Sequence, residues 1–380
     1  MASRLKRDAY VNQSWHDREQ DGLFSHSWHF AGLTSDFKEA GDYRTQQAGR
    51  FPIFVIQQNS GALSAFHNVC RHRGSTLLEG AGNTGKSIIC PYHRWAYVSD
   101  GRLKGAPQMK NCFPDLDRAA LSLKPASIGS LRQLVFVNPD PNADFESFSQ
   151  PLKDNIWPHD LAASDVTEVP PLNYRLKCNW KVFVENAIDG YHLAYLHENT
   201  LGGPLVDENL WERCGNHMIW FATDEKDQRH ALPAKNRKEA KSLWARKIKS
   251  ADSIGYGGVY FLFPNTLIAA TPYSFSISVL HPTSPTTCDM TVRHFGAKGD
   301  AKDQRKYIQG YDKTTDLIQS THWTKPPLES GDFQTEDVWI CEKVQMGLNS
   351  PAFEPGPLSK GAGAEDPIRW FHEALARKNE

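Results

Sequence analysis

The order of apolar and polar residues predicts short strands in the first third of the chain and a mixture of strands and helices after it. Between about 38 and 125, apolar runs such as Phe51–Gln57 end in turn residues, which is the pattern of short β-strands. From 256 to 293, apolar and polar residues alternate in a way that predicts antiparallel strands. Further stretches are expected to be helical: 23–30, 150–165, 179–198, 300–325, 334–348 and 367–378.

This arrangement predicts the α+β class and two domains, a division that a length of 380 residues permits. We expect an N-terminal lead-in over 1–37 that packs on the larger domain. A small all-β domain is expected over 38–150, and a larger domain with an antiparallel sheet over 151–380. The highly charged stretch 224–249 is interpreted as the solvated face of an insertion, with docking of an acidic redox partner as the alternative.

Composition and charge argue against several classes of function. The formal net charge is −1 and the pI is near 6.9, so no general positive field would attract nucleic acid. No apolar run reaches the roughly 18 residues that cross a membrane, and the start of the chain lacks the apolar core of a secretory leader. The 7 cysteines are not spaced as a disulfide framework, which predicts a reducing, cytoplasmic setting.

The most specific chemistry lies in two short motifs, Cys70-Arg-His72 and Cys90-Pro-Tyr-His93. Each offers one thiolate and one imidazole, whereas zinc fingers usually pair cysteine with cysteine and histidine with histidine. Two such loops facing each other could hold a two-iron cluster, with both cysteines on one iron and both histidines on the other. Neutral histidine ligands would place its potential at roughly −150 to +300 mV. With their flanks, CRHRGSTLLEG and CPYHRWAYVSDGRL, the motifs resemble a Rieske 2Fe–2S centre, and a structural zinc site is the alternative.

The segment between these motifs matches a phosphate-binding Walker A loop from Gly80 to Ser87, with Lys86 in the lysine position. Such a loop needs a buried strand before it and a helix after it, because helix N–H groups must point at the phosphates. The β-branched pair Ile88-Ile89 and then Pro91 follow, and these favour a strand rather than a helix. We therefore interpret the segment as a hairpin turn and expect no nucleotide site.

A second group of candidate metal ligands contains Asp189, His192 and His197. Two histidines five residues apart lie about 140° apart on a regular helix, so they converge on one ion only if the helix ends or bulges between them. Asp189 and His192 are three apart and share a helix face. Two histidines and a distant carboxylate form the facial triad of non-haem Fe(II) oxygenases, which leaves positions open for O₂ and substrate.

Together, the two constellations make the chain resemble the oxygenase (α) subunit of the Rieske non-haem iron aromatic ring-hydroxylating oxygenases over nearly its whole length. The resemblance implies a helix-grip-like catalytic domain over 151–380 and a Rieske domain over 38–150. It implies that the metals are held by Cys70, His72, Cys90 and His93 at the cluster and by His192 and His197 at a mononuclear iron. It also implies that Asp189 links the two metal sites and that Asn186 lies near the iron.

The third iron ligand implied by the resemblance is a carboxylate in a late helix, which matches residues 334–348. In the family a glutamate follows that ligand five residues later, and Asp337 and Glu342 have this spacing. Glu336 is the alternative ligand. Either acid could instead be a solvated residue in the first turn of a helix, where carboxylates are favoured.

The resemblance implies an enzyme, the terminal oxygenase of a system with several components. It would take electrons at the cluster and use the Fe(II) and O₂ to hydroxylate a small organic substrate, which is expected to be aromatic. Removal of a methyl group from an O- or N-methyl compound is the alternative. An electron-transfer Rieske protein without catalysis is the rival from another class, and the second iron motif argues against it.

The implied cofactors are one Rieske 2Fe–2S cluster and one mononuclear Fe(II) per chain, with O₂ as co-substrate. The sequence shows no convincing flavin or NAD motif, so NAD(P)H would act through a separate reductase, with or without a ferredoxin. A length of 380 residues favours a homotrimer without a small β subunit.

Overall fold

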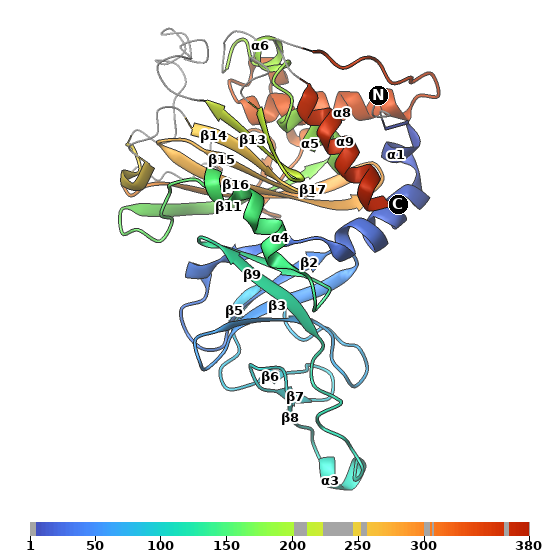
Figure 1. Ribbon diagram of the computed structural model, residues 1–380, viewed down its shortest axis with the longest axis vertical. Helices are drawn as coiled ribbons and strands as arrows, with labels where there is room; N and C mark the ends of the chain where they lie inside the picture. The colour runs from blue at the N-terminus through green and yellow to red at the C-terminus, as the bar shows by residue number, and fades with distance from the viewer. Residues whose placement is uncertain are drawn as a thin grey trace. The chain divides into compact units, whose positions relative to one another are not determined.

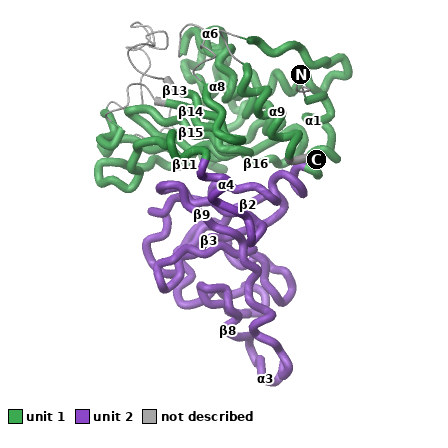
Figure 2. The backbone as a smooth tube through the Cα atoms, in the orientation of Figure 1, with its two compact units in different colours: residues 1–18, 151–380 green, residues 19–150 purple. Residues whose placement is uncertain are grey.

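The computed structural model describes residues 5–200, 211–222, 246–251, 257–299, 305, 308–360 and 365–379. They form two compact units, one of residues 1–18 with 151–380 and the other of residues 19–150 (Figure 1, Figure 2). The unit of residues 19–150 is built mainly from β-sheets, and the unit of residues 1–18 with 151–380 combines an antiparallel sheet with helices. This confirms the predicted α+β class. Most of the charged stretch 224–249 lies outside the described residues.

The unit of residues 19–150 is built on a seven-stranded antiparallel sheet in the order β1-β10-β9-β4-β3-β2-β5. Its strands are β1 His29–Leu33, β2 Asp42–Ala48, β3 Phe51–Gln57, β4 Leu63–His67, β5 Ala81–Asn83, β9 Pro125–Leu131 and β10 Leu134–Asn138. A smaller sheet and two short helices complete the unit: β6 Ile88–Ile89, β7 Ala96–Tyr97, β8 Leu103–Gly105, α3 Met109–Cys112 and α4 Phe145–Ser149.

The apolar run in β3 is buried on both faces of the sheet. Ile53 and Val55 pack in one apolar cluster with residues of β4, β9 and β10. Phe54 and Ile56 point to the other face, into a second cluster that contains Cys70 and Cys90. Because successive side chains of a strand alternate between faces, a continuous apolar run is what a doubly covered strand requires. This burial provides a rigid, dry support for the two cysteine motifs.

The boundary between the units differs from the predicted lead-in over 1–37. Residues 19–37 belong to the smaller unit because β1 pairs with β10, with His29 opposite Val137. Only α1 (Asp8–Val11) and α2 (Gln13–Arg18) join the larger unit, where the hydroxyl of Tyr10 donates to Glu185 at 2.6 Å. The expected helix over 23–30 is wrong, since one π turn (Glu19–Leu23) and one 3₁₀ turn (Phe24–His26) lead directly into β1. Pairing in the sheet has overridden the local preference.

The Walker-like segment connects two different sheets. β5 pairs with β2, and β6 pairs with β7, so the strands on either side of the turn do not form the predicted hairpin. Residues 84–87, all described, form a turn, and the strand β6 follows them where a phosphate loop would need a helix. The expectation that this segment lacks a phosphate-binding context is therefore supported by the local fold.

The larger unit contains a nine-stranded sheet in the order β12-β13-β14-β15-β16-β17-β11-β19-β18. The strands are β11 Val166–Leu176, β12 Trp211–Cys214, β13 His217–Ala222, β14 Gly257–Leu262, β15 Thr266–Ala270, β16 Ser274–Ser284, β17 Thr287–Ala297, β18 Tyr311–Asp312 and β19 Leu317–Ile318. All neighbours are antiparallel except β11 and β19. The strands expected between 256 and 293 are confirmed.

Helices cover one face of this sheet. They are α5 Trp180–Ala187, α6 Leu193–Leu196, α8 Phe333–Asn349 and α9 Asp366–Asn379. The ring of Phe371 in α9 lies 5.5 Å from that of Phe261 in β14 and 5.7 Å from that of Trp180 in α5. On the opposite face, Trp157 meets Tyr260 edge-on at 5.3 Å. The layers therefore place α5 and α9 on one side of the sheet and the segment around Trp157 on the other.

Two stretches expected to be helical have other structures. The segment 150–165 contains only a 3₁₀ turn, Gln150–Asn155, and the described part of 300–325 contains β18, β19 and a 3₁₀ turn, Ser320–His322. The expected helices over 334–348 and 367–378 are confirmed as α8 and α9.

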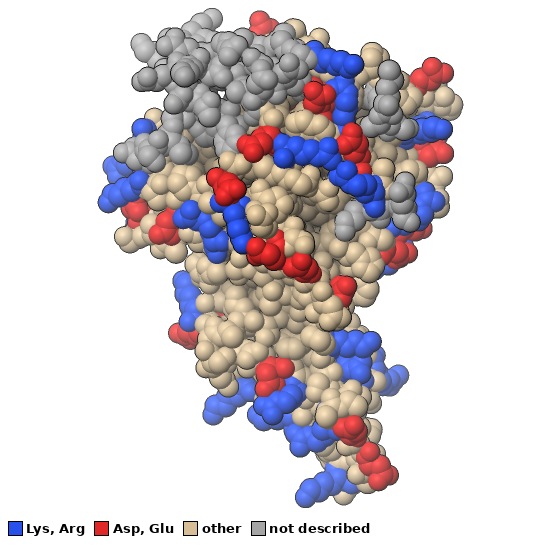
Figure 3. Space-filling model, viewed as in Figure 1, with Lys and Arg blue, Asp and Glu red and all other residues tan. Residues whose placement is uncertain are grey.

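Within the described residues, no helix combines the length and apolar character needed to cross a membrane. Acidic and basic side chains are mixed over the face seen in Figure 3, in keeping with the net charge of −1.

Two candidate metal centres

The first candidate centre lies on two tight loops of the smaller unit. The loop that carries Cys70 closes on itself, since the N–H of Gly74 donates to Cys70 O at 3.0 Å. The loop that carries Cys90 closes in the same way, with the N–H of Arg94 donating to Cys90 O at 3.1 Å. Arg94 has φ of 60°, a left-handed conformation that turns the chain sharply. Each loop thus presents its cysteine and histidine on one side of a short turn.

The two loops bring four metal-binding side chains together. The rings of His72 and His93 lie 4.7 Å apart, and Cys70 and Cys90 are 3% and 1% exposed. The Nδ1 atoms of both histidines are buried and have no hydrogen-bond partner. A buried ring nitrogen without a partner is costly unless it binds something. Two thiols with two unpartnered imidazole nitrogens form the donor set of a two-iron cluster with mixed ligands, so the residues fit this group.

Aromatic side chains hold these ligands in place. Trp95 stacks on the ring of His72 at 4.8 Å with an interplanar angle of 4°. The hydroxyl of Tyr97 lies 3.4 Å from Cys70 Sγ and accepts from the N–H of Arg71 at 3.0 Å. Burial, followed by the neighbouring Cys70, raises the pKa of Tyr97 well above its usual value. The phenol therefore keeps its proton and can donate a hydrogen bond to Cys70 Sγ.

Cys90→Ala is expected to remove the brown colour and the rhombic Rieske signal in electron paramagnetic resonance of the reduced protein. The reason is that thiolate-to-iron charge transfer gives the colour, and a cluster that loses one of four ligands is not retained. Cys112→Ala is the matched control, because Cys112 is an exposed cysteine of the same unit. A colourless, zinc-loaded parent protein with full activity would contradict the cluster.

The second candidate centre begins where α5 ends. Asn179 caps α5 by accepting from the N–H of Lys181 at 2.9 Å, and the helix stops at Ala187. A separate short helix, α6, then begins after His192, and His197 follows its last residue. This interruption is the break that two histidines five residues apart require in order to converge.

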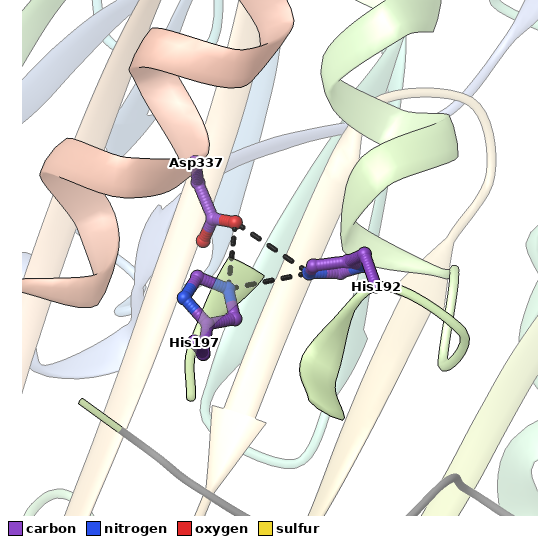
Figure 4. A group of neighbouring side chains, drawn as sticks. All are labelled: His192, His197 and Asp337. Carbon is purple, nitrogen blue, oxygen red and sulfur yellow. Dashed lines mark hydrogen bonds and ion pairs between the residues drawn. The ribbon is translucent and has the colours of Figure 1, made fainter. Parts of the chain in front are cut away.

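His192, His197 and Asp337 form a compact group (Figure 4). The Nε2 atoms of the two histidines are 3.2 Å apart, and Asp337 Oδ1 lies 3.0 Å from His197 Nε2 and 3.6 Å from His192 Nε2. One potential ligand atom from each residue lies within 4.8 Å of the other two. Two imidazoles and one carboxylate on one side of an ion are the ligand set of a non-haem iron centre with open positions. The three residues could therefore hold a mononuclear Fe(II).

A surrounding layer of side chains orients these three. Glu336 Oε2 lies 2.7 Å from His197 Nδ1 and accepts from the hydroxyl of Thr200 at 2.6 Å. The amide of Asn186 donates to Asp337 Oδ1 at 2.8 Å. Asp189 Oδ2 lies 3.3 Å from His192 Nδ1. Carboxylates on the outer nitrogen of a ligating histidine fix its tautomer and raise its basicity, so this layer is what a metal site needs.

Charge in the centre favours an ionised Asp337. Burial by itself would raise the pKa of Asp337, but hydrogen bonds with His192 and His197 outweigh it and hold the pKa well below its usual range. Burial by itself would lower the pKa of His192, but Asp189 and Asp337 outweigh it and raise the pKa to about 9. Without a metal, His192 is therefore held protonated at neutral pH, and a metal must displace this proton when it binds.

The structure brings together the residues predicted from separate parts of the sequence. It places Asp337, rather than Glu336, with its oxygen beside both histidine Nε2 atoms. Glu342 lies away from this group and accepts from the N–H of Lys177 at 3.2 Å. Thr200 was not anticipated by sequence reasoning. Its position three residues after His197 was the available signal, but a lone threonine there is not specific.

Comparisons with known proteins cover both units. The family model described as the ring hydroxylating alpha subunit (catalytic domain) matches residues 163–380, and the Rieske [2Fe-2S] domain matches residues 27–124. The glycine betaine monooxygenase oxygenase subunit of Chromohalobacter salexigens is 35% identical, over 94% of this chain and 82% of that protein.

Solved structures show the same fold. A quaternary ammonium Rieske monooxygenase, whose structure is described in terms of carnitine oxidation and inter-subunit electron transfer, superposes with a TM-score of 0.71 over 100% of both chains at 21% identity. Naphthalene 1,2-dioxygenase from Rhodococcus sp. superposes with a TM-score of 0.67 at 20% identity, over 99% of this chain and 94% of that chain.

Proposed function

This chain belongs to the Rieske-type ring-hydroxylating oxygenases as an oxygenase (α) subunit, and from this membership we propose that it demethylates a small N-methylated ammonium compound. It is an oxidoreductase that uses O₂, a Rieske 2Fe–2S cluster and a mononuclear iron. The observation that carries the reaction class is the approach of His192, His197 and Asp337 in a protein that also bears the cluster motifs.

The protein residues hold and orient what the metals need. Cys70, Cys90, His72 and His93 would hold the cluster, and His192, His197 and Asp337 the mononuclear iron. When bound, these groups supply single electrons and the activation of O₂. Glu336 keeps the His197 ring in one orientation and Asn186 keeps Asp337 Oδ1 in place, so these residues would present their ligand atoms to an iron in a fixed arrangement.

The expected aromatic substrate receives less support than its alternative. Glycine betaine and carnitine, named for two relatives, are both quaternary ammonium compounds. The aromatic dioxygenase shares the fold at 20% identity, and a likeness at that level does not indicate which substrate this chain uses. We infer that one oxygen atom enters an N-methyl C–H bond, while the other oxygen leaves as water with two electrons and two protons. The N-hydroxymethyl product then releases formaldehyde.

Electrons would come from a separate reductase and reach the iron of a neighbouring subunit in a homotrimer. Asp189 supports this route, because its Oδ2 lies beside His192 while its Oδ1 accepts from the N–H of Tyr191 at 2.6 Å. A carboxylate held in this way can contact a second histidine outside its own chain. Inter-subunit electron transfer described for a related monooxygenase supports the same arrangement.

Incubation with glycine betaine, a surrogate reductase and NADH is expected to give formaldehyde and a product lighter by one CH₂ group. The product mass distinguishes the alternatives, because hydroxylation of an aromatic probe such as naphthalene adds one or two oxygens. Oxygenated naphthalene without any turnover of N-methyl compounds would overturn the proposed substrate class while leaving the oxygenase class intact.

A further inference from the structure

One row of residues crosses the sheet of the larger unit on its helical face. Residues directly opposite each other in antiparallel strands point to the same face. The register pairs Trp211 with Trp220, Trp220 with Val259, Val259 with Ala269, Ala269 with Ser276, and Ser276 with His294. Phe261, two residues after Val259, points to the same face and packs on Phe371 of α9. The row therefore faces the helix layer that carries the iron-binding residues.

Residues of this row are more exposed to solvent than those of the neighbouring row, which contains Phe261 and Leu267. Ala269 is exposed although β15 lies inside a nine-stranded sheet, and Val259, Ser276 and Trp220 are only half-buried. In the neighbouring row, Phe261 is fully buried and Leu267 is 7% exposed. A small exposed residue in the interior of a sheet marks a place where another molecule can approach the backbone closely. We call Trp220, Val259, Ala269 and Ser276 the open row.

The strand that carries Ser276 of the open row, β16, is in contact with the helix that leads to the iron-binding group. The side-chain amide of Asn179, the N-cap residue of α5, donates to Pro285 O at 2.7 Å. Pro285 lies in the turn between β16 and β17. Helix α5 is also in contact with β16, and its last turn carries Asn186, the partner of Asp337. Ser276 of the open row lies toward the other end of β16. The iron-binding group and the open row therefore lie on the same face of the sheet.

We propose that the open row is the floor of the substrate site and that Trp220 recognises the methylated ammonium group. This proposal rests on the proposed function and deepens it by naming the residues that select the substrate. An indole has the most favourable aromatic face for a cation, and a quaternary ammonium group is bound in this way in aromatic cages. The ring of Trp211 lies 6.5 Å from that of Trp220, so a second indole borders the same end of the row.

Ala269 supplies the space in this site. Its side chain is a single methyl group at the centre of the row, flanked by Val259 and Ser276. Any larger side chain at this position would project from the sheet into the region that a substrate would occupy. The size of residue 269 therefore sets the bulk of ligand that fits between the sheet and the iron-bearing helices.

The proposal is tested by measuring, with calorimetry and without O₂, the Kd of glycine betaine for the iron-loaded protein. Trp220→Leu is expected to weaken Kd about 5- to 30-fold, and Trp220→Phe less, since phenylalanine keeps a π face. A carbon isostere of the ligand, with a neutral tert-butyl group in place of trimethylammonium, should lose much less affinity in Trp220→Leu. Ala269→Leu is expected to weaken binding of both ligands about 10-fold or more.

The control for Ala269→Leu is Ala162→Leu, at an exposed alanine of the same unit in a loop outside the sheet. It should leave Kd unchanged. Iron content and the cluster spectrum should equal those of the parent in every variant, and this measurement separates lost recognition from misfolding. If Ala269→Leu does not fold, Ala269→Ser replaces it. If the parent binds glycine betaine and both open-row variants bind it equally well, the recognition proposal is wrong while the proposed function stands. If the parent binds no N-methylated ammonium ligand, both are overturned.

Discussion

Asp337→Ala is expected to lose the mononuclear iron and to lower turnover by about 100-fold or more, while the Rieske spectrum remains. Asp337 Oδ1 lies 3.0 Å from His197 Nε2, on the side where both imidazoles present their Nε2 atoms, so the variant lacks one of three ligands. The two metal centres use different residues, and their losses should therefore separate. Metal analysis after desalting, together with electron paramagnetic resonance of the cluster, measures both.

The neighbouring Glu336→Gln provides the sharper comparison. Glu336 contacts the outer nitrogen of His197, so its amide is expected to lower iron affinity by only about 10-fold and to keep a measurable turnover. Glu342→Gln, farther along the same helix, should change neither. An outcome in which Glu336→Gln loses the iron and Asp337→Ala keeps it would show that the third ligand has been assigned to the wrong carboxylate.

Asp189→Asn is expected to keep both metals and a reducible cluster, yet to turn over about 10- to 100-fold more slowly. The amide oxygen can still accept the N–H of Tyr191, so the loop after α5 should keep its shape. The amide NH₂ would meet His192 Nδ1, which donates when Nε2 binds a metal, and two donors cannot pair. The variant would lose the negative charge beside His192 and, in the proposed trimer, the link to a cluster histidine of the next subunit.

Reoxidation of the reduced cluster by O₂, with substrate present, is the measurement that isolates this role. A carboxylate needed only for folding would instead show itself as lost iron, lost assembly or poor yield, which metal analysis and sedimentation would detect. Near-normal reoxidation in a fully metal-loaded Asp189→Asn protein would rule out electron transfer through this residue.

Local chemistry explains why both metal centres could be anticipated from the sequence. The spacings Cys70-x-His72 and Cys90-x-x-His93 place two metal-binding side chains on one turn. Because each kind of metal centre accepts only a few combinations of ligands, these side chains indicate the kind of centre. The interruption between His192 and His197 also followed from helix geometry, since a regular helix would hold the two rings apart. The late helices α8 and α9 were predictable because their apolar spacing is a property of the segment itself.

Other features depended on residues far apart in the chain. The segment 23–30 became the approach to a strand because β10, more than a hundred residues later, offered a pairing edge. The Walker-like turn at 80–87 separated into strands of two sheets for the same reason. Such pairing energy is not visible in a local window, because it depends on which distant strand arrives at the edge.

The sequence by itself determined which chemistry the chain carries: a mixed cysteine–histidine donor set, a second histidine pair and a late acidic helix. The spacing to Glu342 favoured Asp337 over Glu336, but only the tertiary structure shows their different positions, since adjacent residues on a helix point about 100° apart and the packing of α8 against α5 decides which one lies beside both histidine Nε2 atoms. The open row around Ala269 likewise exists only through the register of four strands. Ligand identity is a property of single side chains, whereas orientation and open space are properties of how distant segments pack.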